Sequence, residues 1–442
     1  MHDVSTGILD PLIEAHLIRQ AAEGDEALGG EAPPARPDRK RVNRFRRKRI
    51  RRRFRSVLII LMIPVLISYV GALTGPGADS FQARTVEWAR DHHLGGVVDR
   101  VERSWYAGHQ APVGGVPSAA ARARVAQVST PVIGSAVTAP SLAPTPPAGV
   151  AVGASPTTPT QTLGTSPPAL QSPASSPLAD EGVWSPLLST PSGKVGAYLT
   201  MIRPDNVHTS SLDAVIRFDA SVYSFRHYPG AKIPGAPWDR PDYVEPERQS
   251  VLVAAFAGGF RLRDSNGGML LGGHELRAMR EGGATFSIDA NGVANVGMWG
   301  RDIYATDRLD SARQNLDLIV DAGTPIADLA NDPNRKWGFT GPANKSAVWR
   351  SGAGVTSDGA LIWVGGPGLT IQALAETLVR AGAVRGMQLE INQEWVQFNS
   401  YAPNATGAVS GTKLLDGMQH TGDRWLSEDT RDFVAVFRRP AA

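Results

Sequence analysis

The segment 349–395 constrains the fold of this chain most, because turn residues divide it into strand, helix and strand. Asp358-Gly359 predicts a tight hairpin turn between two apolar strands. Thr370 predicts the N-cap of a helix whose apolar residues share one face, and Gly382 predicts its end. Residues 383–391 predict the next strand. A strand–helix–strand crossover favours a parallel strand pair, so we expect a mixed sheet.

Short apolar runs between turn residues predict a sheet-rich α+β domain with this βαβ crossover at its centre. The other predicted strands are residues 195–202, 213–219, 251–256, 285–288, 293–298, 317–320, 360–364 and 433–437. Helices are expected only at 311–318 in part, 370–381 and 414–420. The run Asp289-Ala290-Asn291-Gly292 predicts a second hairpin, and the glycines of 365–368 are expected to end a strand.

An apolar stretch near the N-terminus predicts membrane attachment. Residues 56–78 carry no charge and follow a strongly basic run, so the stretch is long enough to cross a hydrocarbon core of about 30 Å. The basic flank places residues 1–55 in the cytoplasm as a tail and the C-terminal domain outside the cell membrane. The alternative is a cleaved signal peptide, against which stand the long basic region and the lack of a clean cleavage site.

Three further regions follow the predicted single-pass transmembrane anchor. Residues 79–110 predict two short amphipathic helices, broken at Gly95-Gly96, that lie on the outer membrane face. Residues 111–183 are rich in Pro, Ala, Ser and Thr, and their composition predicts a disordered stalk that holds a domain away from the membrane. Residues 184–442 are expected to form that domain.

Composition excludes several classes of function. The chain has no cysteine, which excludes disulfides and thiolate ligands. Residues 1–55 hold 14 Lys and Arg against 8 Asp and Glu, whereas the rest is slightly acidic, so a nucleic-acid partner is not expected. The histidines of the domain are scattered without metal-ligand spacing, and we expect neither a metal nor a cofactor. The sequence leaves the oligomeric state open.

Three stretches contain residues suited to chemistry. Gly258 and Gly259 follow an apolar strand, where glycines allow the backbone either to approach a ligand closely or simply to turn. Arg350 precedes a Gly-rich segment, where it can bind a phosphate or form a surface ion pair. Glu390 ends a strand, where a carboxylate can take part in glycoside hydrolysis or cap a loop.

Together, in this order and spacing, these stretches resemble the phosphodiester glycosidase family, in particular its bacterial membrane-anchored members. The matching segments are Ala257-Gly258-Gly259-Phe260, Arg350-Ser351-Gly352-Ala353-Gly354 and Leu389-Glu390-Ile391-Asn392-Gln393-Glu394-Trp395. The resemblance covers about residues 195–440. It implies a hydrolase that cleaves a sugar-1-phosphodiester, the glycosidic bond to phosphate, in an envelope glycopolymer or glycoconjugate.

The resemblance also implies roles for individual residues. Arg350 and Glu390 are the expected catalytic residues: Arg350 neutralises the phosphate, and Glu390 is the catalytic carboxylate. The backbone N–H groups of Gly258 and Gly259 assist Arg350. The remaining expected substrate-binding residues are Phe260, Asn392, Glu394 and Trp395.

Two positions depart from the family pattern, and they keep a second function open. Ala257 stands where the family has Asn, and Glu390 where it has Asp. The alternative is therefore a catalytically inactive envelope protein that binds a glycan or a phosphate in the same cleft. A third alternative, a purely architectural envelope protein, predicts no cleft on which Arg350 and Glu390 converge.

Overall fold

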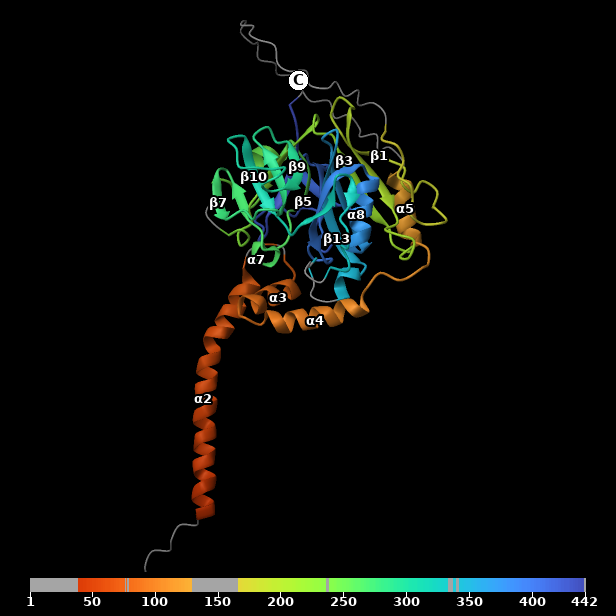
Figure 1. Ribbon diagram of the computed structural model, residues 1–442. Coiled ribbons are helices and arrows are strands. Elements are labelled where there is room, and N and C mark those ends of the chain that lie inside the picture. The colour runs from red at the N-terminus through yellow and green to blue at the C-terminus, as the bar shows by residue number, and fades with distance from the viewer. Residues whose placement is uncertain are drawn as a thin grey trace, which may run out of the picture. The chain divides into compact units, whose positions relative to one another are not determined.

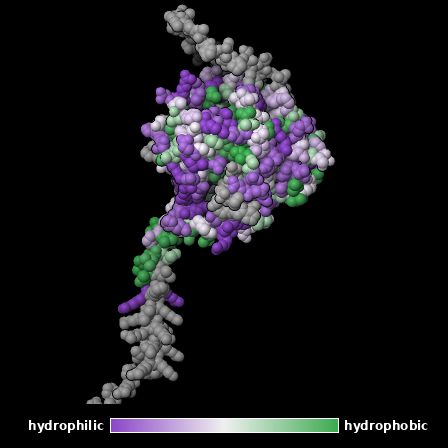
Figure 2. Space-filling view, viewed as in Figure 1, coloured by the Kyte–Doolittle hydropathy of each residue, from purple (hydrophilic) through white to green (hydrophobic). Residues whose placement is uncertain are grey.

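The computed structural model describes residues 39–128 and 166–440, apart from 76, 78, 236–237, 333–336 and 339–341. The chain divides into two compact units, Met1–Ser68 and Tyr69–Ala442. Helix α2 (Arg39–Thr74) contains Pro64, and its part Arg55–Thr74 is, among the described residues, the one helix long and apolar enough to cross a membrane. Hydrophobic residues of this part are green in Figure 2. The first 38 residues of the predicted tail and residues 129–165 of the predicted stalk lie outside the described residues.

The second unit is built around three sheets whose strand ladders are antiparallel (Figure 1). The first has eight strands, in the order β1 (Ser185–Ser189), β2 (Val195–Ile202), β3 (Asp213–Phe218), β14 (Leu361–Leu369), β13 (Val348–Thr356), β15 (Ala383–Ile391), β11 (Leu318–Asp321) and β12 (Thr324–Pro325). The second has five, in the order β7 (His274–Arg277), β6 (Met269–Leu271), β10 (Leu309–Gln314), β8 (Ala284–Asp289) and β9 (Ala294–Met298). The third has five, in the order β17 (Val409–Lys413), β16 (Phe398–Pro403), β5 (Leu252–Ala257), β18 (Phe433–Arg438) and β4 (Tyr223–Tyr228). The sheet-rich α+β prediction is thus confirmed.

Helices are short and lie around these sheets. They are α3 (Phe81–Asp91), α4 (Gly95–Gly108), α5 (Ala119–Val128), α6 (Pro246–Gln249), α7 (Leu262–Ser265), the 3₁₀ helix η1 (Pro342–Lys345) and α8 (Ile371–Arg380). Residues 414–420 form turns, so the helix expected there is wrong. The helix expected at 311–318 is also wrong, because residues 311–314 belong to β10, which pairs with both β6 and β8, and Leu318 begins β11.

The predicted hairpin, cap and helix end around α8 are confirmed. Strands β13 and β14 form the hairpin, with Gly359 at φ +80°. The Thr370 hydroxyl accepts from the backbone N–H of Ala373 at 3.0 Å, and Gly382 after α8 has φ +90°. The expected parallel pair is wrong, because β13 lies between β14 and β15 and is antiparallel to both. The α8 crossover therefore passes over one strand.

The glycines of 365–368 do not end β14, which continues to Leu369. They are needed because neighbouring side chains lie close to the strand. A Cβ at Gly366 would lie 2.0 Å from Asp213 Oδ1, and one at Gly365 would lie 2.4 Å from the ring of Trp363. The glycines fit the strand between its neighbours, so their tertiary packing outweighs their low strand propensity.

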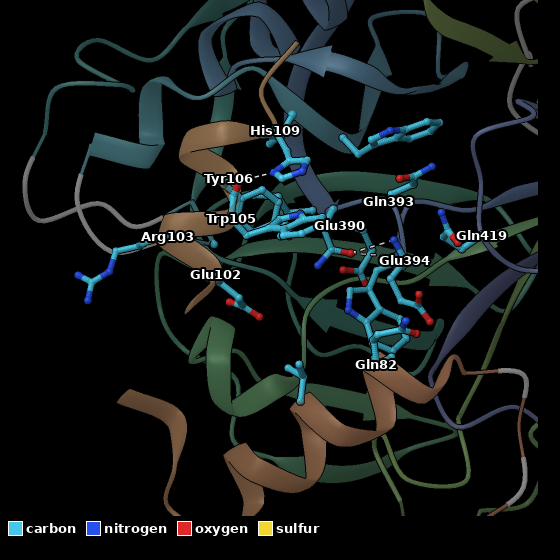
Figure 3. Close-up of a pocket in the computed structure, with 18 of the residues that line it drawn as sticks. Gln82, Glu102, Arg103, Trp105, Tyr106, His109, Glu390, Gln393, Glu394 and Gln419 are labelled. Carbon is cyan, nitrogen blue, oxygen red and sulfur yellow. Dashed lines mark hydrogen bonds between the residues drawn. The ribbon is translucent and has the colours of Figure 1, made fainter. Parts of the chain in front are cut away.

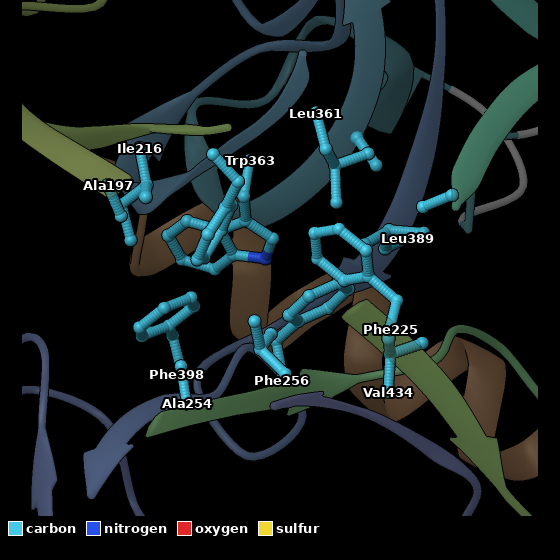
Figure 4. Packing of buried hydrophobic residues seen from close by; sticks show 14 of the residues in the cluster. Ala197, Ile216, Phe225, Ala254, Phe256, Leu361, Trp363, Leu389, Phe398 and Val434 are labelled. Atoms are coloured by element: carbon cyan, nitrogen blue, oxygen red, sulfur yellow. The ribbon is translucent and has the colours of Figure 1, made fainter. Parts of the chain in front are cut away.

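The main hydrophobic core draws its side chains from all three sheets. Figure 4 shows its aromatic centre, where Phe256 of β5 stacks on Phe398 of β16 with ring centroids 6.2 Å apart. Trp363 of β14 closes this group from the first sheet, 5.0 Å from Phe398. A second cluster, which includes Leu374 and Leu378 of α8, packs on β14 and β15. Burial on this scale fixes the position of β15, whose end carries Glu390.

Both described ends of the predicted stalk pack on the domain, which differs from the expected boundary at residue 184. Before the gap, the Gly114 N–H donates to the Val207 carbonyl at 2.7 Å, and Ala121 of α5 packs against the main core. After it, Leu170 is buried, and Glu181 forms an ion pair with Arg203 at 2.8 Å. Described residues on both sides of 129–165 therefore contribute to the folded domain.

Candidate functional site

Glu390 lies near the C-terminal end of β15, as the sequence predicts, and its side chain faces a cavity. The residue is 1% exposed, and its Oε1 accepts from Nη2 of Arg431 at 3.2 Å. Burial raises the pKa of the Glu390 carboxyl above its ordinary value, which the positive charges of Arg431 and Arg313 partly offset. A buried carboxyl group with a raised pKa in a cavity is a candidate for general acid–base catalysis.

Arg431 joins the two other predicted stretches to Glu390. It precedes β18 by two residues and donates to the Gly259 carbonyl at 3.2 Å. Its guanidinium carbon lies 3.9 Å from the centroid of the Trp395 ring, a cation–π contact. On its other side, Nη1 lies 3.5 Å from Oε1 of Glu87 on α3. Burial opposes the charge of Arg431, but these carboxylates outweigh that effect and raise its pKa.

A buried ion pair supports Arg431 from beneath. Arg313 of β10 donates through Nε to Asp432 Oδ2 at 2.6 Å, and His227 Nε2 lies 3.0 Å from the same oxygen. All three side chains are fully buried. Although burial opposes ionisation, Arg313 and His227 hold the pKa of Asp432 well below its ordinary range. This network fixes the residue next to Arg431 and so restricts where its guanidinium lies.

Gly258 and Gly259 pack closely against Asp432 and Arg313, and neither glycine lines the cavity. The Gly258 N–H donates to the Asp432 carbonyl at 3.1 Å, and a Cβ there would lie 2.3 Å from Asp432 Oδ2. Gly259 has φ +145°, and its Cβ would lie 2.6 Å from Nη1 of Arg313. The glycines therefore let the backbone approach the buried ion pair. The Gly258 N–H, which was expected to assist Arg350 at the phosphate, thus donates to the Asp432 carbonyl.

Asn315, which follows β10, joins the glycine segment to the end of β15. Its amide donates to the carbonyls of Gln388 and Leu389, both at 2.8 Å, and its Oδ1 accepts from the Phe260 N–H at 3.3 Å. Phe260 lines the cavity, as the sequence predicts. A single buried amide therefore sets Phe260 in a fixed position relative to Glu390.

The turn after β15 brings the other predicted residues to the cavity. Asn392 has φ +69°, and its Oδ1 accepts from the backbone N–H groups of Glu394 at 3.0 Å and Trp395 at 3.2 Å. This local hydrogen bonding is what lets Asn occupy the left-handed region. Glu394 in turn accepts from the N–H and the hydroxyl of Ser80, each at 3.0 Å. Asn392, Glu394 and Trp395 all line the cavity.

Arg350, one of the two expected catalytic residues, does not line the cavity. Its side chain is fully buried and donates to the carbonyls of Leu369 at 3.1 Å and Trp337 at 2.8 Å, and to Gln388 Oε1 at 3.2 Å. Burial lowers its pKa to about 9. Arg350 thus ties β13 to its surroundings, whereas Arg431 lines the cavity beside Glu390. Ala257, the other departure, is packed in the third sheet and also lies outside the cavity.

Helices α3 and α4 form one wall of the cavity, whose volume is about 1190 Å³. Figure 3 shows Glu390 and Glu394 with Trp105 and Tyr106 of α4 beside them, and Gln82 of α3 below. The Tyr106 hydroxyl is hydrogen-bonded to Asn392, and burial raises its pKa. The chain forms two separate helices here, α3 ending at Asp91 and α4 starting at Gly95, so the break lies at 92–94 and not at Gly95-Gly96, the expected place. No pattern in the sequence indicates that these helices cover the site.

Four residues of the site were not predicted from the sequence: Arg431, Glu87, Ser80 and Tyr106. One available signal was the charged run Asp429-Thr430-Arg431-Asp432 directly before an apolar strand, because a charged run there is unusual for a plain turn. The three residues of the 79–110 segment carried no such signal. Their role depends on where α3 and α4 pack.

Comparisons with known proteins add resemblances at low identity. No family model matches, and no curated protein matches. Among solved structures, the zebrafish N-acetylglucosamine-1-phosphodiester alpha-N-acetylglucosaminidase catalytic domain, auto-inhibited by its pro-peptide, aligns with TM-score 0.37 and 12% identity over 55% of this chain and 83% of that one. A hypothetical protein from Synechocystis aligns with TM-score 0.31 and 12% identity over 55% and 62%. A putative exported protein from Burkholderia pseudomallei aligns with TM-score 0.31 and 13% identity over 52% and 74%.

Proposed function

We propose that the second unit hydrolyses a sugar-1-phosphodiester in an envelope glycopolymer or glycoconjugate. The observation that carries the proposal is the pairing of Glu390 with Arg431, 3.2 Å apart, on the wall of a cavity of about 1190 Å³. This volume exceeds the roughly 300–1,000 Å³ of an ordinary small-molecule pocket, and so accommodates a sugar together with its phosphate and part of an aglycone.

Arg431 is suited to bind the phosphodiester, and Glu390 to activate the attacking water. Arg431 supplies the positive charge that an anionic phosphodiester needs, in a buried place where charge interactions are strong. Glu390 takes the proton of the attacking water, whose oxygen joins the anomeric carbon. The bond between that carbon and the bridging oxygen breaks, and the phosphate monoester leaves with the bond's electrons. A phosphate ester is a weakly basic leaving group, so one carboxylate is sufficient.

In this proposal Arg431, and not Arg350, neutralises the phosphate. Trp395 still contributes to substrate binding. One face of the Trp395 ring is covered by Arg431, so a sugar can contact only its edge or opposite face. Glu394 and Asn392 offer hydrogen-bonding groups for hydroxyls at the same wall. In this proposal the domain lies outside the membrane, because basic residues precede the apolar part of α2.

The test is release of reducing sugar from the methyl phosphodiester of N-acetylglucosamine-1-phosphate by the full-length protein in detergent. We expect turnover by wild type, and a loss of about a hundredfold or more in Glu390→Gln and in Arg431→Lys. Matched controls are Glu428→Gln and Arg248→Lys, both exposed, which should keep wild-type rates. Turnover by Glu390→Gln within about twofold of wild type would show that Glu390 is not the catalytic carboxylate.

The alternative is binding without catalysis in the same cavity. The observation that favours it is the pairing of Arg431 with Glu87 as well as with Glu390, which leaves its charge doubly balanced. It predicts no turnover by wild type, together with binding of the same methyl phosphodiester by calorimetry that weakens in Arg431→Lys. Turnover that appears in Glu390→Asp would identify a lapsed active site.

A further inference from the structure

We infer that the substrate of this site is anchored in the same membrane as α2, as a sugar-1-phosphodiester of a long-chain lipid alcohol. This inference deepens the proposed function and rests on it. Three structural observations carry it: the fixed end of the apolar helix, the short path from that end to the site, and an exposed apolar face on the helix that walls the cavity.

The end of the apolar helix is fastened to α3. The Arg84 side chain is almost fully buried, and its guanidinium donates to the carbonyls of Gly75 and Gly77, each at 2.6 Å, and of Asp79 at 3.0 Å. The Tyr69 hydroxyl is hydrogen-bonded to Thr85 at 2.9 Å. A guanidinium that binds successive carbonyls after a helix end fixes the direction in which the chain leaves it. The last turn of α2 and α3 are therefore one structure.

The path from this helix end to the site is short. Ser80, which holds Glu394, comes six residues after Thr74, the last residue of the apolar helix. Six residues span at most about 20 Å even when fully extended. The polar headgroup layer on each side of a bilayer is roughly 6 Å thick. If Thr74 lies where the apolar core ends, the cavity wall lies at the membrane surface.

Helix α4 carries an apolar stripe on its exposed side. Spacings of three and four residues place its members on one helix face. They are Leu94 just before the helix, Val97, Val101 and Trp105, which are 45%, 58%, 63% and 59% exposed. Exposed Arg100 and Arg103 flank this stripe. Tryptophan and arginine beside an apolar helix face are typical of a helix that lies in the interface of a membrane with anionic lipids.

The same stripe forms part of the cavity rim. Val101 and Trp105 line the cavity and are exposed, whereas Tyr106 on the inner side reaches Asn392. When Arg431 holds the phosphate of the substrate, the aglycone attached to that phosphate therefore extends out of the cavity over apolar side chains that face the bilayer. A lipid chain fits such a rim, because its contact removes apolar surface from water. A polar glycopolymer would not be stabilised by contact with this apolar rim.

The position of α4 is testable without any enzyme activity. Because the chain contains no cysteine, a nitroxide label on Val97→Cys reports one site in the full-length protein reconstituted in vesicles of phosphatidylcholine and phosphatidylglycerol. We expect the label to be accessible to oxygen and protected from a water-soluble nickel chelate. The control is a label on Tyr304→Cys, an exposed position on another loop, which should show the reverse. Equal, aqueous accessibility at both positions would overturn the inference.

The substrate class is tested in the same vesicles. Farnesyl and methyl phosphodiesters of N-acetylglucosamine-1-phosphate are compared at equal total concentration. We expect the farnesyl ester to be hydrolysed at least about tenfold faster, because the shared membrane raises its local concentration at the site. Leu94→Glu combined with Val97→Glu should reduce that preference and leave the methyl rate unchanged, since neither residue lines the cavity. Equal rates for both esters would overturn the lipid substrate while the proposed function stands. Hydrolysis of neither ester would remove both, whatever the label at residue 97 shows.

Discussion

The carboxylate of Glu394 accepts from both the backbone N–H and the hydroxyl of Ser80, residues separated by 314 positions in the chain. This contact makes the segment after the apolar helix a part of the site. A chain that begins at residue 184 would lack Ser80, Glu87 and Tyr106, and with them one wall of the cavity. Experiments on function therefore need the full-length protein.

Ser80→Ala should reduce turnover as well as stability, whereas the loss of a helix cap alone reduces only stability. The Ser80 hydroxyl caps α3 through Ala83 and also binds Glu394. We expect a stability loss of about 1 kcal/mol and reduced turnover of the methyl phosphodiester. Ser118→Ala removes the corresponding cap contact with Ala121 at the start of α5 and should cost similar stability with no change in turnover. Equal turnover in both variants would mean that Ser80 does not position Glu394.

Gly259→Ala should be strongly destabilising. At φ +145° the backbone conformation is nearly restricted to glycine, and the new Cβ would lie 2.6 Å from the buried Arg313 guanidinium. We expect a loss of roughly 3 kcal/mol or more, measured by urea unfolding. Gly407→Ala is the matched control, because Gly407 has φ +84° and open space where the Cβ would be. It should cost only about 1–2 kcal/mol, from backbone strain alone. Similar losses in the two variants would argue against close packing at Gly259.

Asp213 should make stability depend on pH. Its side chain is fully buried beneath Gly366 and Gly368, and burial raises its pKa to about 8. An unfolded Asp has a pKa of about 3.9, so between about pH 4 and pH 8 the folded state binds more protons than the unfolded state. The free energy of unfolding should therefore fall as pH rises through this range. Asp213→Asn should remove this dependence and stabilise the protein at pH 7 by on the order of 3 kcal/mol. Urea midpoints across this range provide the measurement, with exposed Asp307→Asn as the control. Parallel pH curves for wild type and Asp213→Asn would contradict the assignment.

Glu181→Gln should destabilise the domain, because residues before 184 belong to it. The Glu181 carboxylate accepts from Arg203 Nε at 3.0 Å and from Nη2 at 2.8 Å, and neither side chain is appreciably exposed. Removing one charge leaves the other buried without its partner, which costs about 3 kcal/mol. Exposed Glu428→Gln should leave the urea midpoint unchanged. A Glu181→Gln midpoint equal to that of wild type would restore the boundary expected at residue 184.

Local patterns in the sequence were enough to place the elements around α8. The Asp358-Gly359 turn, the Thr370 cap and the Gly382 end depend only on backbone conformations and hydrogen bonds within a few residues, and all three are present. The apolar stretch in α2 depends on composition alone. The place of Glu390 near the end of β15 follows from the length of the apolar run.

Sheet order was beyond local patterns. No local pattern in residues 361–391 indicates that β13 lies between β14 and β15, because strand order depends on pairing across the whole sheet. The glycines of β14 likewise read as breakers until Asp213 is seen beside Gly366. Propensity was overridden in both places by burial against partners distant in sequence.

The chemical groups near the end of β15 can be recognised from the sequence, but which of them meet depends on the tertiary fold. Glu390 and Trp395 were identifiable from their segment, but Arg431 meets them through a strand of another sheet. Arg350 carries the same charge, and the packing of β13 directs it to carbonyl groups away from the cavity. Helix α4 was predictable as an amphipathic helix, whereas the face that it turns to the site follows from its packing. A site is a set of distances between residues far apart in the chain, and these distances are fixed by burial and by ion pairs that form only in the folded state.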